Sequence, residues 1–563
     1  MKDTFAKEQK PLESCQAPSF SFYQLIDDLW HQGGNPNPLH RLCTLMRKMK
    51  VKSFIREELE LNEELLEEQN MAIQRYNQNV GLTATRLTFF RSLPSPLKWD
   101  DPNELPDDHL LGYAVIATLE LPDDEYRTYL LESVVRPPSI WIPGVENDLS
   151  IEPITNYYVH NTRDFETTIG TEGKSRPLTL TGSFFAQQND ITHVCAHAAL
   201  RMAINSSSTL TTEKLTNQRI NEILGIDFTS PEKCVGHIDG DPPETKTGLN
   251  YQELEAVVRQ LGGRTVSADF VQNTAVEYDQ FIYPFVESAC PVILGIEGWN
   301  FNRSSIISHV VSVLGHTLNS DRWEPEARSG YGGFPAESYT PVTAWVGHYI
   351  INDDNFGMYV TLPSDMLRNY LVPSKNPNLH ATRAIAIVPS GVRLSGLLAE
   401  GMAVSFVQSL AKSEWMDQFV IFLKQTGLPI IWLKRLAQQS DKIVSRTLLQ
   451  TKSSYRQYID GLVQRGQVTL TPEIRQRFEN MPEHIWVSEI TLPHLYTGNK
   501  HKLGDVIIDA NATDEEHSTV ESFQLAWFPG FIYFGSDHQI LPWGVRTHVP
   551  LIREEETVPL LEW

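Results

Sequence analysis

Three side chains, taken in their order along the chain, constrain the fold more than any other feature of this sequence. Cys195 lies where an apolar helical pattern begins, in VCAHAALRMAI. His309 begins a strand-like segment, HVVSVLGHT, and Asp353 ends another, WVGHYIIND. A cysteine, a histidine and an aspartate in this order are typical of a catalyst whose nucleophile is a thiol. This stretch of chain is therefore the candidate functional site.

The predicted position of Cys195, in the first turn of a helix, suits a nucleophile. The N–H groups of a first turn lack partners within the helix, and the helix dipole places partial positive charge there. Both effects favour the thiolate, which is the reactive form. The alternative is a small buried cysteine that packs as a hydrophobic residue. The polar run QQND before the cysteine, and the histidine and aspartate after it, favour the catalytic interpretation.

The two strand-like segments offer a way to bring His309 and Asp353 together. If the segments pair antiparallel, the start of the first lies beside the end of the second. The carboxylate would then orient the imidazole and stabilise its charged form. Successive side chains of a strand point to opposite faces, so only one of Asp353 and Asp354 is expected to face His309. We expect Asp353 to do so, with Asp354 capping the turn that Gly357 completes.

A thiol catalyst also needs a hydrogen-bond donor for the oxyanion, besides the backbone N–H of the nucleophile. Gln187 and Gln188 lie shortly before Cys195, and the side-chain amide of either could serve. We expect Gln188 to be this donor because it is nearer to the cysteine in sequence. The alternative is that both are ordinary polar residues of a loop.

These residues and their surroundings resemble the papain-like cysteine peptidase superfamily, on the segments QQNDITHVCAHAAL, PVILGIEGW, SHVVSVLGH and YIINDDNFG. Within it, the bacteriocin-processing (double-glycine) peptidases are the most similar in pattern. The resemblance covers about residues 181–395. It implies an α+β fold with a papain-like core, in which the helix bearing the nucleophile packs on an antiparallel sheet. It also implies a catalytic set of Cys195, His309, Asp353 and Gln188.

The match departs from that family around the nucleophile. Val194 and Ala196 stand where those peptidases usually have aspartate and glycine. The loop between the two strand-like segments is also longer than is usual in the family. These differences leave the substrate class open.

The texture of the chain predicts extensions on both sides of this core. Glu- and Leu-rich helical patterns give way to β-branched and aromatic strand patterns near residue 82. We interpret the charge run in REELELNEELLEEQN as a solvated helix face. The predicted units are a disordered tail (residues 1–20), a helical segment (21–81), a β-rich unit (82–180), the peptidase-like domain (181–395), and a domain with helices before strands (398–563).

Composition narrows the class of protein. A net charge of −23 disfavours nucleic-acid binding, which needs clustered lysine and arginine. No stretch approaches the ~20 apolar residues of a membrane span, and the first residues lack the apolar core of a signal peptide. Five scattered cysteines in 563 residues do not suggest a disulfide framework. A reducing compartment, the cytoplasm, is the simpler expectation, and the family resemblance suggests a bacterial source.

The resulting hypothesis is a cytoplasmic cysteine peptidase that acts on a protein or peptide substrate, with its extensions as further protein-binding surfaces. We expect no cofactor and no metal. The alternation of His193, Cys195 and His197 could suggest a metal site, but this spacing does not converge on a helix, and zinc needs further ligands. Two alternatives stay open. The same thioester intermediate could serve deamidation or transglutamination, or the chain could be a binding or scaffold protein with an inert site.

Overall fold

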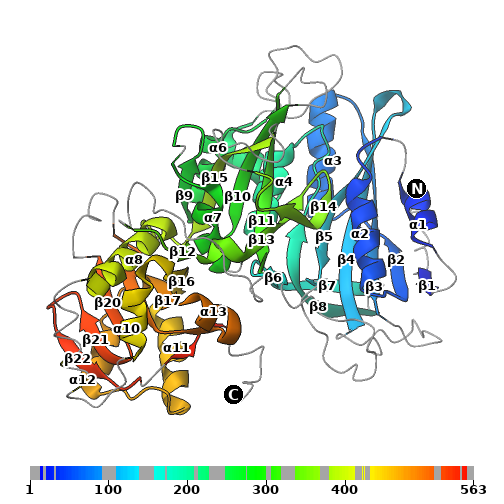
Figure 1. The fold of residues 1–563 in the computed structure, drawn as a ribbon. Helices are drawn as coiled ribbons and strands as arrows, with labels where there is room; N and C mark the ends of the chain where they lie inside the picture. The colour runs from blue at the N-terminus through cyan, green and yellow to red at the C-terminus, as the bar shows by residue number, and fades with distance from the viewer. Residues whose placement is uncertain are drawn as a thin grey trace.

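The computed structural model describes residues 13–16, 21–30, 33–91, 109–137, 157–171, 174–207, 213–226, 248–273, 275–299, 306–318, 337–367, 379–412, 421, 424, 431–512, 522–545 and 548–553. Within them the fold is α+β, as predicted, and almost every strand pairing is antiparallel. Figure 1 shows an N-terminal sheet, a central sheet and a C-terminal sheet, with the central one between the other two. No helix in these ranges is both long and apolar enough to cross a bilayer.

The N-terminal sheet combines two of the predicted units. Its strand order is β1-β2-β3-β4-β5-β8-β7. The strands are β1 (Glu13–Gln16), β2 (Ser53–Glu58), β3 (Gly81–Phe90), β4 (Leu110–Glu120), β5 (Tyr126–Val135), β7 (Arg163–Thr171) and β8 (Lys174–Phe185). The helices that accompany it are α1 (Phe22–Leu29), α2 (Asn37–Lys48) and α3 (Glu63–Tyr76). A single sheet therefore spans what the sequence divided into a helical segment and a β-rich unit.

Three boundaries differ from the predicted ones. The range 21–81, expected to be helical, contains strand β2, whose core positions Phe54 and Ile55 are buried. Residues 13–16 of the expected disordered tail form β1, which pairs with β2. The rest of that tail lies outside the described residues. Strand β8 crosses the predicted boundary at residue 181, because its last residues pair with β5.

The central sheet has the order β14-β13-β11-β10-β15-β9, and β6 adds to β11. Its strands are β6 (Tyr157–Val159), β9 (Arg264–Asp269), β10 (Val292–Trp299), β11 (Ile306–Leu318), β13 (Val346–Asp353), β14 (Gly357–Pro363) and β15 (Leu379–Val388). The helices beside it are α4 (Cys195–Asn205), α5 (Asn217–Leu224), α6 (Tyr251–Gln260) and α7 (Tyr278–Glu287). This sheet carries the candidate site.

Alternation along β10 and β11 places helices on both faces of the central sheet. Ile293 and Val310 pack with α4 and α6 in one apolar cluster. Val292 and Val311, their chain neighbours, pack with α7 in another. Adjacent side chains of a strand point to opposite faces, so α4 covers one face and α7 the other. A helix with the cysteine at its first residue thus lies directly on the sheet.

The C-terminal sheet has the order β12-β16-β17-β19-β20-β21-β22, and β18 pairs separately with β23. Its strands are β12 (Thr340–Pro341), β16 (Val444–Thr451), β17 (His484–Thr491), β19 (Gly504–Asp509), β20 (Phe523–Phe528), β21 (Gly530–Phe534) and β22 (Ile540–Trp543), with β18 (His501–Lys502) and β23 (Val549–Pro550) beside them. Its helices are α8 (Gly396–Lys412), α10 (Ile431–Gln438), α11 (Lys452–Gln464), α12 (Pro472–Glu479) and α13 (Pro493–Asn499). Strand β12 comes from the predicted peptidase-like range, so the units interlock.

A buried chain of charges joins the central and C-terminal sheets. Arg446 of β16 donates to Glu287 at the end of α7 (2.6 Å) and to Glu489 of β17 (2.8 Å). Lys502 lies 2.8 Å from the other oxygen of Glu489 and also pairs with Asp505 at 2.8 Å. All five side chains are at most 5% exposed. Alternating signs along the chain of groups compensate the cost of burying each charge.

Candidate active site

The helix that begins at Cys195 has no cap from the side chain of the residue before it. Val194 is in an extended conformation, and its backbone N–H donates to Nδ1 of His197 in the first turn (3.4 Å). The backbone N–H groups of His197 and Ala198 donate to the Val194 carbonyl. The rest of α4 is buried, whereas the Cys195 side chain is only half-buried. The thiol therefore lies at an accessible helix start, as the sequence predicted.

His309 lies between this thiol and two carboxylates. It is on β11, which begins three residues earlier than predicted, at Ile306. The side chain is 17% exposed, and its Nε2 lies 3.2 Å from Asp353 Oδ1. The Cys195 side chain also lies close enough to the ring to help raise the pKa of His309. Because Nε2 faces the carboxylates, Nδ1 is the ring nitrogen left for the thiol.

The antiparallel pairing predicted for the two strands is confirmed. Strand β11 pairs with β13, with Ser312 opposite Asn352. The start of β11 therefore lies at the end of β13, where Asp353 projects. The register of the pair ends at Ser312 and Asn352, so His309 and Asp353 lie just beyond it at the same end of the paired strands.

Both neighbouring aspartates approach His309, contrary to the prediction that only one would. Asp354 Oδ1 lies 3.5 Å from His309 Nε2. Strand β13 ends at Asp353 and the chain then turns, so strand alternation does not apply to Asp354. Asp353 instead caps the turn, because its Oδ1 accepts from the N–H groups of Asn355 (2.8 Å) and Phe356 (3.3 Å). The turn returns to β14 through Gly357, whose φ of +109° favours glycine.

The two carboxylates have different environments. Asp354 is fully buried, and neither of its oxygens accepts a hydrogen bond from another described residue. Burial raises the pKa of Asp354 to about 7, against the opposing effect of His309 and with added repulsion from Asp353 and Asp190. For His309, burial alone would lower the pKa, but the bonds to Asp353 and Cys195 and the two carboxylate charges raise it to about 11. The geometry thus favours a charged imidazole beside the thiol.

The two candidate glutamines have different surroundings. Gln187 is buried, its Oε1 accepts from the Leu130 N–H (3.0 Å), and its Nε2 donates to the Asn35 carbonyl (2.7 Å). Its amide therefore holds the loop against the N-terminal sheet. Gln188 is half-buried and makes no side-chain hydrogen bond to the residues described. Of the two, only the Gln188 amide is free for a ligand.

The loop before the cysteine rests on a buried polar cluster that the sequence did not predict. Glu68 of α3 accepts hydrogen bonds from Tyr129 (2.8 Å) and Asn217 (2.7 Å) and lies 3.2 Å from His193 Nε2. Burial would raise the pKa of Glu68, but His193 and Arg201 lower it to about 2. Glu68 belongs to the charge run that was interpreted as a solvated helix face, yet it is 1% exposed. Its place on the same helix face as the buried Leu65 and Ala72 was the available signal.

The histidines that flank the nucleophile point to partners of their own. His193 pairs with Glu68, and His197 Nε2 lies 2.9 Å from Asn221 Oδ1. Burial lowers the pKa of His197 to about 3, so this ring is neutral. Neither histidine is paired with Cys195 in these contacts.

Tyr251, which packs against the same apolar cluster as Cys195, is in contact with Arg383. The guanidinium of Arg383 lies over the Tyr251 ring, 5.1 Å from its centroid, and the Tyr251 hydroxyl is 3.1 Å from Thr382 Oγ1. Burial raises the pKa of Tyr251, and the charges of Glu297 and Cys195 raise it further. Tyr251 thus lies near Cys195.

Two groups of ligand-type side chains converge within the described ranges. One is His309 with Asp353 and Asp354, and the other is His160 with Glu287 and His316. In the first group the imidazole also lies near the Cys195 side chain, which suits proton transfer to and from a thiol. The second group lies away from the cysteine and has no part in this arrangement.

Comparison with known proteins adds no relative. No protein-family model matches the chain, and no curated protein is similar to it in sequence.

Proposed function

We propose that the chain is a cysteine peptidase with a papain-like core, in which Cys195, His309 and Asp353 form the catalytic set. The observation that carries this proposal is the position of His309, in contact with the Cys195 side chain and 3.2 Å from the Asp353 carboxylate. A nucleophile, a base and a group that orients the base are the parts of a thiol catalyst. The cysteine helix packed on an antiparallel sheet supports the same interpretation.

Each residue has a defined role in the proposed reaction. The Cys195 thiolate attacks the carbonyl carbon of the scissile peptide bond, and the backbone N–H of Cys195 with the Gln188 amide stabilises the resulting oxyanion. Protonated His309 donates its proton to the leaving amine, which gives a thioester and a free amine. Neutral His309 then accepts a proton from water, which hydrolyses the thioester and releases the acid and the thiolate. Asp353 keeps the ring oriented throughout.

The compartment and the substrate follow from the same chemistry. The nucleophile must stay reduced to react, so we place the protein in the cytoplasm. The substrate is a protein or peptide, since the attack requires an amide carbonyl. The N-terminal and C-terminal sheets flank the site and offer surfaces that could select it.

The test is Cys195→Ala in the full-length protein. We expect proteolysis to fall by at least about 10³-fold, as on removal of a nucleophile. The assay is mass spectrometry of new N-termini after incubation with a proteome. Cys290→Ala is the matched control, because burial raises the pKa of this thiol to about 12 and leaves it unreactive.

The same assay separates the competing functions. The assay could instead show glutamine deamidation or cross-linking without new N-termini. If the Cys195→Ala variant loses this activity, the reaction is another acyl transfer and not peptide hydrolysis. Iodoacetamide labelling of Cys195 no faster than of Cys290 would indicate an inert site and a binding protein. Full activity of the Cys195→Ala variant would reject the nucleophile.

A further inference from the structure

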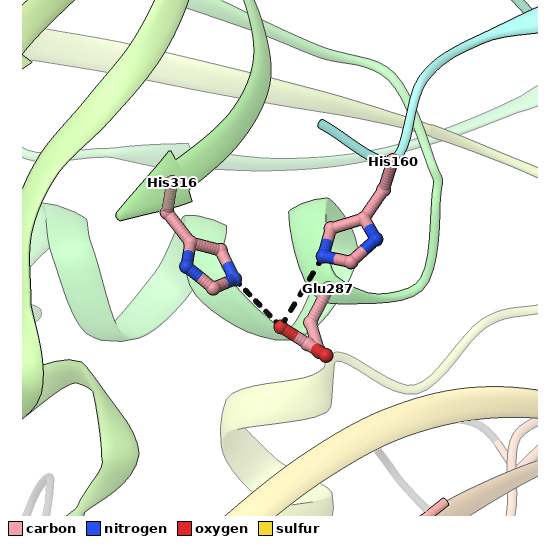
Figure 2. A group of neighbouring side chains, drawn as sticks. All are labelled: His160, Glu287 and His316. Atoms are coloured by element: carbon pink, nitrogen blue, oxygen red, sulfur yellow. Dashed lines mark hydrogen bonds and ion pairs between the residues drawn. The ribbon is translucent and has the colours of Figure 1, made fainter. Parts of the chain in front are cut away.

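A second convergence of side chains lies where the three sheets meet. His160 follows β6, Glu287 ends α7, and His316 is on β11. Figure 2 shows both imidazole rings directed at the same oxygen of the Glu287 carboxylate. His316 Nε2 lies 2.6 Å from this oxygen, Oε2, and His160 Nε2 lies 3.6 Å from it. Three potential ligand atoms therefore point at one small volume.

One of the three ligand atoms, His160 Nε2, has no hydrogen-bond partner among the described residues. At 3.6 Å the His160 Nε2 is too far from Glu287 Oε2 for a hydrogen bond. This nitrogen is buried, and no described residue provides it with a partner. An unpartnered buried polar atom is costly unless something binds it. The His160 ring is held in place by stacking on Tyr158, 6.2 Å between centroids, so the nitrogen stays directed into the group.

The other carboxylate oxygen is already committed, which fixes how Glu287 can bind a ligand. Oε1 accepts from Arg446 Nη2 at 2.6 Å, and Arg446 is itself held by Glu489 at 2.8 Å. Ligating carboxylates are commonly held by such outer hydrogen bonds. The arginine holds the carboxylate with Oε2 toward the two imidazoles, where His316 Nε2 already contacts it at 2.6 Å. Arg446 is also paired with Glu489, so its charge is shared between two carboxylates.

We propose that His160, Glu287 and His316 form a binding site for one divalent transition-metal ion, with zinc as the best match. Two imidazoles and one monodentate carboxylate are a ligand set that zinc prefers, with a fourth position for water or another donor. Tetrahedral zinc at about 2.0–2.2 Å from each ligand places ligand atoms about 3.3 Å apart. The observed 3.6 Å fits this spacing, and the 2.6 Å contact lengthens when a metal replaces the shared proton.

The position of the site assigns it a structural role. The three ligands come from the β6–β7 connection, from α7 and from β11, and Arg446 extends the contact to the C-terminal sheet. A metal would cross-link these elements. His160 is 16% exposed, whereas Glu287 is 2% exposed, so an ion would enter from the His160 side. The inference does not depend on the proposed peptidase activity.

The test is metal binding by the full-length protein after removal of metal with a chelator. Zinc is titrated in competition with a chromophoric chelator, and cobalt is added to a second sample for its visible absorption. We expect about one equivalent of zinc per chain and the intense cobalt bands of four-coordinate sites. Zinc should also raise the melting temperature of the protein.

Variants of single histidines test which residues bind the zinc ion. His160→Gln should weaken zinc binding at least about 100-fold, more than the usual effect of losing an outer-sphere partner. It should still fold, because His160 is at the edge of the group, and circular dichroism checks this. His348→Ala is the matched control, an exposed histidine on the neighbouring strand that should bind zinc as the parent does.

Two further outcomes decide against the site. A parent protein that binds no zinc after chelation would overturn the inference, and so would equal binding by His160→Gln and the parent. His309→Ala is measured alongside, because the catalytic group is the other convergent set of ligand-type side chains. Loss of zinc in His309→Ala but not in His160→Gln would move the metal to the catalytic group and reject the present proposal.

Discussion

At the scale of single residues, the neighbours Asp353 and Asp354 differ in what they hold. Asp353 binds both His309 and the backbone of the turn, so its position is fixed. Asp354 is buried beside the same ring without a hydrogen bond from another described residue. The contacts of Asp353 can orient the imidazole of His309. The burial of Asp354 makes its ionised form unfavourable in the folded protein.

The two aspartates should therefore respond differently to substitution by asparagine. Asp353→Asn should slow turnover by about 10²-fold or more, because the ring loses its oriented carboxylate. Asp354→Asn should keep more of the activity and should stabilise the fold at pH 8 by about 1 kcal/mol or more. The raised pKa of Asp354, about 7 against 3.8, means that ionisation opposes folding as pH rises between these values. Turnover and melting temperature at pH 4 and pH 8 are the measurements, and greater loss of turnover in Asp354→Asn would exchange the roles.

The raised pKa of His309 also predicts that stability depends on pH. His309 is a base whose charged form stabilises the fold, in contrast to the acid Asp354, whose charged form destabilises it. A base whose folded pKa, about 11, exceeds its ordinary value of 6.5 contributes stability that is complete below pH 6.5. This contribution is lost as pH rises from 6.5 toward 11. His309→Gln should therefore be less stable than the parent at pH 6, and the gap in melting temperature should narrow by pH 10. His348→Gln, exposed on the neighbouring strand, should show no such trend; a constant gap for His309→Gln would show that its charge does not stabilise the fold.

At the scale of elements, helix α3 supports the loop that leads into Cys195, through the contact of Glu68 with His193. Glu68 satisfies a tyrosine, an asparagine and a histidine, and the histidine belongs to the loop that leads into α4. A single carboxylate on one helix thus positions the start of another. This link consists of buried hydrogen bonds. Removing one partner leaves the other buried and unsatisfied, which lowers the free energy of unfolding more than replacing both partners by apolar groups.

Glu68→Gln should be strongly destabilising. We expect a loss of about 2–4 kcal/mol in the free energy of unfolding at pH 7, since a buried ionic partner is removed. The lowered pKa of Glu68, about 2 against 4.5, means that its stabilisation is present above pH 4.5 and is lost as pH falls toward 2. Urea unfolding at pH 7 and at pH 3 measures both effects. Glu63→Gln, exposed at the start of the same helix, is the control; equal losses in the two variants would contradict the role of Glu68.

The comparison of sequence with structure shows which elements can be predicted from local sequence patterns. The α4 start at Cys195 and the strands β11 and β13 follow from patterns within each segment, whereas the pairing of β11 with β13 was assumed in order to bring His309 to Asp353. Strand β2 was read as helix because SFIREE continues a charged, apolar-periodic run. Its strand conformation is set by pairing with β1 and β3, which local periodicity does not encode. The approach of Asp354 to His309 depends on where β13 ends, and a boundary is the least predictable part of a strand.

At the scale of the whole molecule, the charge chain through Arg446 connects two sheets. Arg446→Met should cost about 3–5 kcal/mol, because it leaves Glu287 and Glu489 buried without their partner. Hydrogen exchange should increase in β16 and at the end of α7 before it increases in the N-terminal sheet. Arg477→Met is the control, because its partner Asp537 is exposed and solvent screens the pair, so a much smaller loss is expected. Similar losses in both variants would show that the buried chain of charges does not hold the sheets together.

The contacts of α2 and β12 have a consequence for how the chain is made. Arg41 of α2 donates to the carbonyls of Met358 and Tyr359 in β14, and β12 pairs with β16, a strand that begins at Val444. Neither α2 nor β12 can form these contacts until its partner strand, β14 or β16, has been synthesised and has left the ribosome. Loop-closure entropy makes such distant contacts slow to form, and exposed apolar surface invites aggregation meanwhile. Production of this protein should accordingly be sensitive to the rate of translation and to chaperone supply, and truncation before Tyr359 should leave α2 without its docking surface.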